Sequence, residues 1–239
     1  MSLLEVNGLD VDHGLVRAIR SFGVTVEAGE KVAVIGANGA GKSTLLRCIA
    51  GTLPATNGSI VLDGEDVTRL PAHRRVPKGI AMVPEGRRLF RSLSVEENLM
   101  TGAYRGRTGP WSMSSVLELF PWMASRRRQS AAQLSGGEQQ AVAIGRALMS
   151  NPRVLLVDEL SLGLAPVIVQ RIYEALPSIV DNGCSILLVE QDVSQALAVA
   201  DQVHCLLEGS AVLSGRPADL EMSAVEAAYF GTTASPGVS

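Results

Sequence analysis

The sequence contains a glycine-rich segment whose residue types suit phosphate binding, GANGAGKST at residues 36–44. It matches the pattern GxxxxGK[ST] in full, between an apolar run and a helical pattern, which is the context that the pattern requires. Glycines let backbone N–H groups surround a phosphate, and the following helix N-terminus adds positive potential. Lys42 offers a cation to the terminal phosphates, and the Ser43 hydroxyl suits Mg²⁺. The expected nucleotide-binding residues here are Gly36, Asn38, Gly39, Ala40, Gly41, Lys42, Ser43 and Thr44.

Two adjacent carboxylates, Asp158 and Glu159, follow a run of four apolar residues. In a sheet that carries a phosphate-binding turn, a carboxylate at the end of a neighbouring strand holds the Mg²⁺ shell. The next acid is then placed to orient or deprotonate an attacking water molecule. Taken alone, the pair would also suit a solvated strand end. Beside residues 36–44, it predicts a metal site for Asp158 with Ser43, and a catalytic role for Glu159.

A third segment, LSGGEQQ at residues 134–140, precedes a long helical pattern. The backbone amides of Ser135, Gly136 and Gly137 would be exposed at that helix N-terminus, where anions are favoured. Because one phosphate-binding turn already holds its own nucleotide, a second anion-binding turn indicates contact with a phosphate bound elsewhere. By itself, the turn is equally consistent with a plain helix cap.

These segments must be positioned by strands and helices that alternate along the chain. Apolar runs end at the polar segments described above, and such runs between helices predict a mainly parallel sheet with helices on both faces. The block at about 86–150 is mostly helical and is expected as an insertion into that sheet. The runs expected as strands of the sheet are 31–36, 79–86, 153–158, 185–190 and 202–207, and short strands are expected at 3–7, 15–19 and 23–27.

The composition describes a packed globular protein and excludes several classes. The 239 residues are 46% hydrophobic and 19% charged, and a net charge of −3 gives no reason to expect nucleic-acid binding. The N-terminus lacks a signal-peptide pattern, and the apolar runs fall short of the roughly 18–20 residues that span a bilayer. The three cysteines show no CxxC spacing and indicate a reducing compartment. Residues 232–239 are expected to be disordered.

The three motifs, in the order in which they occur along the chain (residues 36–44, 134–140 and 158–159), resemble those of the ATP-binding-cassette (ABC) ATPases. LSGGEQQ is close to the signature sequence of that family, and the resemblance runs from about residue 3 to residue 231. It implies a single ABC ATPase domain at 1–231, with a RecA-like P-loop core, an N-terminal antiparallel β layer and the inserted helical subdomain. It also implies a head-to-tail dimer that holds ATP and Mg²⁺ between one subunit's P-loop and the other's signature turn.

Further segments resemble the LivF-type ATPase subunits of branched-chain amino-acid importers. They are MVPEGRRLF, LSVEENL, AIGRALM, DELSLGLAP, LLVEQD and VEAAYFG. The resemblance implies a peripheral subunit at the cytoplasmic face of the membrane, paired with itself or with a related ATPase, and bound to permease subunits that receive cargo from a solute-binding protein. Alternatives are an importer of urea, amides or another small polar solute, a weakly hydrolysing regulatory subunit, and a soluble ABC ATPase outside transport.

The resemblance extends to three residues that depart from the commonest family pattern. His13 stands where an aromatic residue usually stacks on adenine, although a surface histidine in a turn is the alternative. Glu85 stands where many relatives have a glutamine that links metal and water to the helical insertion. Gln191 stands where many have a histidine near the γ-phosphate, and its amide can donate but cannot carry a charge. Glu85 and Gln191 are expected to sense the γ-phosphate.

Two loop segments carry further expectations from the resemblance. The basic segment with Arg87, Arg88 and Phe90 is expected to face the permease, and a solvated loop is the alternative. The segment SLGLAP at 161–166 lacks the aspartate that is common in the family, which leaves communication across the dimer open.

Overall fold

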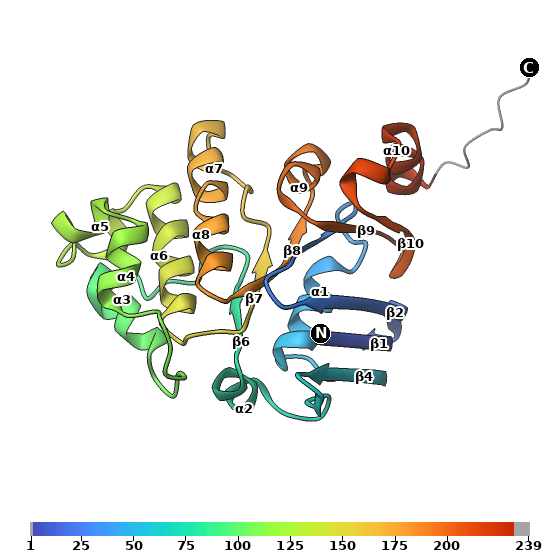
Figure 1. Ribbon diagram of the computed structural model, residues 1–239, viewed down its shortest axis with the longest axis horizontal. Helices are drawn as coiled ribbons and strands as arrows, with labels where there is room; N and C mark the ends of the chain where they lie inside the picture. The colour runs from blue at the N-terminus through green and yellow to red at the C-terminus, as the bar shows by residue number, and fades with distance from the viewer. Residues whose placement is uncertain (1, 232–239) are drawn as a thin grey trace, which may run out of the picture.

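Two β-sheets organise the part of the chain that the computed structural model describes, residues 2–231 (Figure 1). The larger sheet has the strand order β10-β9-β3-β8-β7-β6, and the smaller one β2-β1-β4-β5. The tail predicted to be disordered, residues 232–239, lies outside the described residues.

The larger sheet is parallel except at one edge. Its parallel strands are β3 (Lys31–Ile35), β6 (Ile80–Val83), β7 (Val154–Asp158), β8 (Ser185–Glu190) and β9 (Gln202–Leu207). The edge strand β10 (Ser210–Gly215) is antiparallel to β9. Every residue of β7 and β8 is buried, because both faces of the sheet are covered. The predicted mainly parallel sheet is confirmed.

Each face of the larger sheet contributes to a different hydrophobic core. Along β7, Val154 and Leu156 pack with α1 (Lys42–Ala50) and the smaller sheet. Leu155 and Val157 point the opposite way, into a core shared with most of the remaining helices. These helices include α7 (Pro166–Tyr173), α8 (Leu176–Asp181), α9 (Val193–Val199) and α10 (Met222–Phe230).

The smaller sheet differs from its sequence prediction. It consists of β1 (Ser2–His13), β2 (Val16–Glu27), β4 (Asn57–Leu62) and β5 (Glu65–Asp66). The prediction of three short strands before residue 28 was wrong, because two twelve-residue strands form instead. Register shifts, with positive φ at Gly8 and Ser21, absorb the residues that looked like breaks. The Ser21 N–H is satisfied by the Asp10 carboxylate at 2.8 Å.

The helical block lies between β6 and β7, beside the sheet (Figure 1). It contains α3 (Val95–Gly102), α4 (Met113–Leu119), α5 (Trp122–Ser125) and α6 (Gly136–Leu148). Capping boxes begin α3, α4 and α6, so serine side chains fix where these helices start. Helices occur where the insertion was predicted, and the subdomain boundaries at 86 and 150 stay a prediction. Within residues 2–231, no helix has the length and apolarity needed to cross a membrane.

A buried arginine closes the helix that follows the P-loop. Arg75, at the end of α2 (Ala72–Arg75), is 1% exposed. Its guanidinium donates to the carbonyl oxygens of Cys48 and Ile49, in the last turn of α1, at 2.9 and 2.8 Å. It also donates to the carbonyls of Thr68 and Leu70. A cation at a helix C-terminus is favourable, so Arg75 ties α1 to the segment before β6.

Candidate nucleotide-binding site

The P-loop, the glycine-rich segment at residues 36–44, joins β3 to the first turn of α1 and packs tightly against its neighbours. Gly41 forms the N-cap of α1 with φ of 109°, in the left-handed region. A Cβ at Gly41 would lie 2.5 Å from the Ala18 carbonyl oxygen, and one at Gly36 would lie 2.4 Å from the Leu206 carbonyl oxygen. Both positions therefore require glycine, because a side chain would displace backbone on either side of the turn.

Lys42 places a buried cation between the loop and the acid pair. It is 4% exposed, and its Nζ donates to the carbonyl oxygens of Gly36 at 2.7 Å and Ala37 at 3.2 Å. The same Nζ lies 3.5 Å from Oε1 of Glu159. Three oxygen atoms from two separate segments surround the ammonium group, and they fix its position despite the flexibility of the lysine side chain.

A hydroxyl and a carboxylate form an oxygen donor pair beside this lysine. Ser43 Oγ donates to Oδ1 of Asp158 at 2.9 Å, and Asp158 is 1% exposed. Burial raises the pKa of Asp158, and the nearby carboxylates of Glu159 and Glu85 raise it further, whereas the Ser43 hydrogen bond opposes them. Oxygen donors of this kind are the ligands that Mg²⁺ prefers. The residues present therefore fit a divalent cation, which would favour the ionised form of Asp158.

This raised pKa predicts a stability difference that depends on pH. The folded-state pKa of Asp158 lies above its usual 3.8. Its contribution to folding stability is therefore fully present below pH 3.8 and is lost as pH rises through the folded-state pKa. We expect Asp158→Asn to gain thermal stability relative to wild type as pH rises from about 4 to 7. Added Mg-ATP should favour wild type increasingly over the same range, because metal binding requires the ionised carboxylate.

The measurement is the melting temperature of both proteins across this pH range, with and without Mg-ATP. Because all other titrating groups are the same in both proteins, the difference between their melting temperatures isolates the effect of Asp158. A difference in melting temperature that stays constant with pH would contradict the prediction.

Glu159 has an unusual backbone conformation for its residue type. Its φ is +49°, and its N–H donates to the Val189 carbonyl oxygen at 3.0 Å. Residues other than glycine are uncommon in this region, and such strained positions occur often at functional sites. The turn begins directly after β7 and leaves the Glu159 carboxylate beside Lys42.

Most of the sequence-predicted residues line one cavity of about 600 Å³. This volume lies in the range of small-molecule sites. Asp158 adjoins the cavity through Ser43, and Gly36 and Ala40 lie buried in the loop. The roles of these residues stay predictions, although their convergence is a structural fact. The predicted residues that line the cavity are His13, Asn38, Gly39, Gly41, Lys42, Ser43, Thr44, Glu85 and Glu159.

Gln191 lies on the other side of Glu159. The two residues share a second cavity of about 390 Å³, to which Ser161 and Tyr229 also contribute. Gln191 follows β8 and is exposed, and its carbonyl oxygen accepts a hydrogen bond from Tyr229 Oη at 3.3 Å. The prediction placed Gln191 beside both the P-loop and Glu159. The structure brings it to Glu159 and not into the cavity that the P-loop lines.

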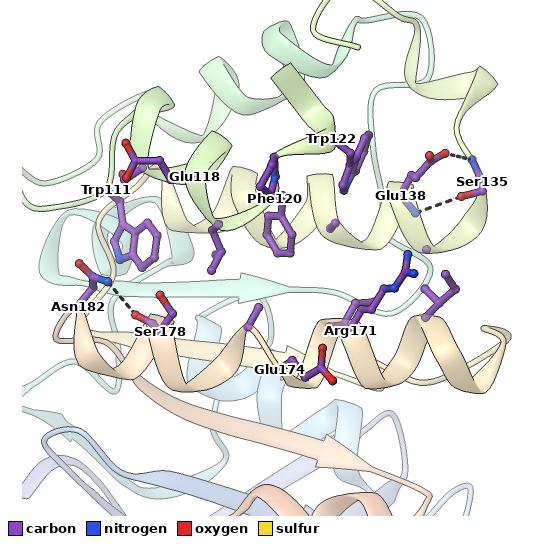
Figure 2. Close-up of a pocket in the computed structure, with 18 residues that line it drawn as sticks. Trp111, Glu118, Phe120, Trp122, Ser135, Glu138, Arg171, Glu174, Ser178 and Asn182 are labelled. Atoms are coloured by element: carbon purple, nitrogen blue, oxygen red, sulfur yellow. Dashed lines mark hydrogen bonds between the residues drawn. The ribbon is translucent and has the colours of Figure 1, made fainter. Parts of the chain in front are cut away.

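The signature turn lies apart from the P-loop of its own chain. Ser135 caps α6 in a capping box with Glu138, and Gly136 begins the helix. Ser135 and Gly137 line a cavity of about 690 Å³ between the inserted helices and α7–α8. Figure 2 shows Ser135 and Glu138 at one end of this cavity, opposite Arg171 of α7. No residue of the P-loop lines it.

One buried acid of this region was missed by the sequence analysis. Glu190, the last residue of β8, is completely buried and accepts hydrogen bonds from Ser161 and Tyr173. The sequence feature that could have indicated its burial is an acid directly after the apolar run at residues 186–189.

Comparison with known proteins gives consistent results over nearly the whole chain. Residues 19–161 match the family model of the ABC transporter. The chain is 45% identical to the high-affinity branched-chain amino acid transport ATP-binding protein BraG of Pseudomonas aeruginosa, over 96% of this chain and 100% of BraG. It is 36% identical to a probable branched-chain amino acid transport ATP-binding protein LivF of Archaeoglobus fulgidus, over 79% of this chain and 81% of LivF.

Solved structures show the same fold. The ADP conformation of MJ1267, an ATP-binding cassette of an ABC transporter, matches with a TM-score of 0.83 and 25% identity, over 97% of this chain and 99% of MJ1267. The cavity lined by the P-loop, the separate signature turn, the family match and this likeness agree. The chain therefore belongs to the ABC transporter family, as one of its ATP-binding proteins with the fold of an ABC ATPase cassette.

Proposed function

We propose that this chain is the Mg²⁺-dependent ATPase subunit of an ABC importer for branched-chain amino acids. The observation that carries the ATPase part is the convergence of Lys42, the Ser43–Asp158 pair and Glu159 around one cavity. The cargo rests on the similarity to BraG and LivF, since an ATPase subunit does not itself touch the transported solute.

In this proposal, the chain's own residues divide the work on ATP. The loop amides and Lys42 bind the phosphates, and His13 stacks on the adenine at the cavity edge. Ser43 and Asp158, with Glu85, would hold Mg²⁺, which when bound neutralises phosphate charge. Glu159 orients a water molecule for attack on the γ-phosphorus and accepts its proton. Glu85 reports the presence of the γ-phosphate to the helical insertion, and Gln191, which adjoins Glu159 outside this cavity, reports it to β8 through Glu159.

We infer that the active form is a head-to-tail dimer, formed with a second copy or with a related ATPase. The support is the separation of Ser135 and Gly137 from the cavity of their own chain. A helix N-terminus that is remote from its own nucleotide is suited to the phosphates held by a partner. Closure around ATP would then shift the populations of the attached permease.

The surface for the permease is proposed at the loop after Glu85. Phe90 is 53% exposed, and the Arg146 guanidinium lies 5.8 Å from its ring centroid. Arg146 also donates to the carbonyl oxygens of Arg88 and Arg87, at 2.8 and 3.1 Å. The loop is therefore held in place while its aromatic ring faces solvent, as a docking surface requires. With the permease bound at this loop, the proposal implies a peripheral location at the cytoplasmic face of the membrane.

The test is a tagged pull-down from detergent-solubilised native membranes, with partners identified by mass. Two multi-span subunits should be recovered, and the Phe90→Asp variant should lose them while its ATP affinity is retained. Recovery of no membrane subunit by the wild-type chain would overturn the transport proposal. Uptake of labelled leucine against labelled urea, measured after the recovered assembly is reconstituted into sealed vesicles with its solute-binding protein, separates the two cargo classes.

We predict that Gln191→Ala slows ATP hydrolysis less than Glu159→Gln does. Within residues 2–231, the Gln191 side chain makes no hydrogen bond, and it does not line the P-loop cavity. We expect a loss below about tenfold for Gln191→Ala, against the roughly 10²–10⁴-fold that a general base contributes. Steady-state phosphate release measures both. The opposite ranking would make Gln191 the principal catalytic group.

A further inference from the structure

Glu190 combines complete burial with an ionisable carboxyl group that the proposed chemistry does not use. It is 0% exposed, and within residues 2–231 no lysine or arginine forms an ion pair with it. Its Oε1 accepts from Tyr173 Oη at 2.7 Å and from the Ser161 N–H at 3.3 Å. Its Oε2 accepts from Ser161 Oγ at 2.9 Å. A buried carboxylate without a cation is costly, so these donors must compensate for lost hydration.

The three segments that meet at Glu190 include the one that carries Glu159. Ser161 follows Glu159 by two residues, and Tyr173 ends α7. Beyond Ser161 the loop is poorly anchored, because Leu162 is 50% exposed and Gly163 is exposed. On the Glu159 side, the backbone has its left-handed φ and one hydrogen bond to Val189, the neighbour of Glu190 in β8. The end of β8 thus holds both ends of the Glu159–Ser161 turn.

We propose that Glu190 is a positioning residue for ATP hydrolysis: its buried carboxylate anchors Ser161 and thereby holds Glu159 toward Lys42. This inference rests on the proposed role of Glu159. The anchor acts on the turn after β7 and not on the P-loop, since residues 36–44 make no hydrogen bond to Ser161, Tyr173 or Glu190 within the described part of the chain. Loss of the anchor should therefore reduce turnover while ATP binding is kept.

The hydrogen-bond geometry supplies a matched pair of variants. In Glu190→Gln, the amide oxygen at the Oε1 position can accept from Tyr173 Oη and the Ser161 N–H. The amide NH₂ at the Oε2 position can donate to Ser161 Oγ, because a hydroxyl both donates and accepts. Glutamine therefore keeps the contacts with Ser161 and Tyr173 and removes the ionisable carboxyl group. Alanine removes the contacts themselves and leaves the Tyr173 hydroxyl and Ser161 without their acceptor.

The experiment compares kcat, ATP affinity and melting temperature for both variants of the full-length chain. We expect Glu190→Ala to lose about 10- to 100-fold in kcat, since small displacements of a catalytic group are costly, with ATP affinity changed by less than about threefold. Glu190→Gln should stay within about threefold of wild type in kcat, because the anchor is intact. Adding Ser161→Ala to Glu190→Ala should cause no further loss, since both substitutions remove one interaction.

Specific outcomes would overturn the inference. A wild-type kcat in Glu190→Ala would do so, and so would equal losses of kcat in the alanine and glutamine variants. Parallel losses of ATP affinity and kcat would assign Glu190 a purely structural role. If Glu190→Ala does not fold, Ser161→Ala tests the same anchor, with reduced kcat and unchanged ATP affinity expected. Normal turnover in Glu159→Gln would refute the proposed role of Glu159, and no turnover in the wild-type chain would refute the proposed function, which keeps these failures distinct.

Discussion

Glu159→Gln should bind ATP at least as tightly as wild type and hydrolyse it at least about 10²-fold more slowly, the lower limit of what a general base contributes. The carboxamide keeps the shape of the side chain and still accepts a hydrogen bond, but it cannot take a proton from water. Binding should be preserved because Lys42 keeps its two carbonyl partners, Gly36 and Ala37. Loss of a carboxylate beside the phosphates also removes a repulsive charge.

The measurement pairs steady-state phosphate release with equilibrium ATP binding. Glu118→Gln provides the matched control, because it makes the same chemical change at an exposed position on α4. The control should retain wild-type values for both quantities. Near-normal turnover in Glu159→Gln would remove Glu159 from the role of base or water orienter. It would leave Ser43 and Asp158, with the Mg²⁺ that they would hold, as the principal catalytic element.

The parts of the site that the sequence predicted are those built from contiguous segments. A strand, a glycine turn and a helix follow one another at 31–50, so their arrangement is local. Asp158 and Glu159 could be added because β3, β8 and β7 are parallel neighbours, whose carboxyl ends meet at one edge of the sheet. The pattern of apolar runs was sufficient to predict this edge.

The parts that the sequence did not predict depend on contacts between distant side chains. Glu190 is satisfied by Ser161 and Tyr173, from two other segments, and Arg75 by carbonyl oxygens of one loop and a helix end. Within residues 2–231, neither forms an ion pair that a sequence pattern would predict. The position of Gln191 depends on the direction in which the chain leaves β8, which residue spacing does not determine.

Lys42→Ala should reduce ATP affinity by about 10-fold to more than 100-fold, since a hydrogen bond to a charged group contributes about 1.5–3 kcal/mol. The reason is the charge balance of the cavity. Lys42 is 4% exposed, and among the described residues it is the only lysine or arginine that lines the cavity. Two acids, Glu85 and Glu159, also line the cavity, and Asp158 adjoins it. Without the ammonium, phosphates would face carboxylates across a largely buried site.

Lys31→Ala is the matched control for this variant. Lys31 begins β3, the strand that leads into the P-loop, and it forms a partly exposed ion pair with Asp201 at 3.0 Å. Because exposed ion pairs contribute at most about 1 kcal/mol, this substitution should leave ATP affinity unchanged. Equilibrium titration with ATP, with and without Mg²⁺, measures both variants. Wild-type affinity in Lys42→Ala would show that the loop amides and metal alone hold the phosphates.

The contrast between Lys42→Ala and Glu159→Gln separates binding from chemistry within one ion pair. Their side chains lie 3.5 Å apart, yet the lysine faces the loop carbonyls and the glutamate ends the turn after β7. If the pair served only to stabilise the apoprotein, both substitutions would lower the melting temperature and affect ATP in the same way. Loss of affinity in one variant and slow turnover with intact affinity in the other requires that each residue act on bound ATP separately.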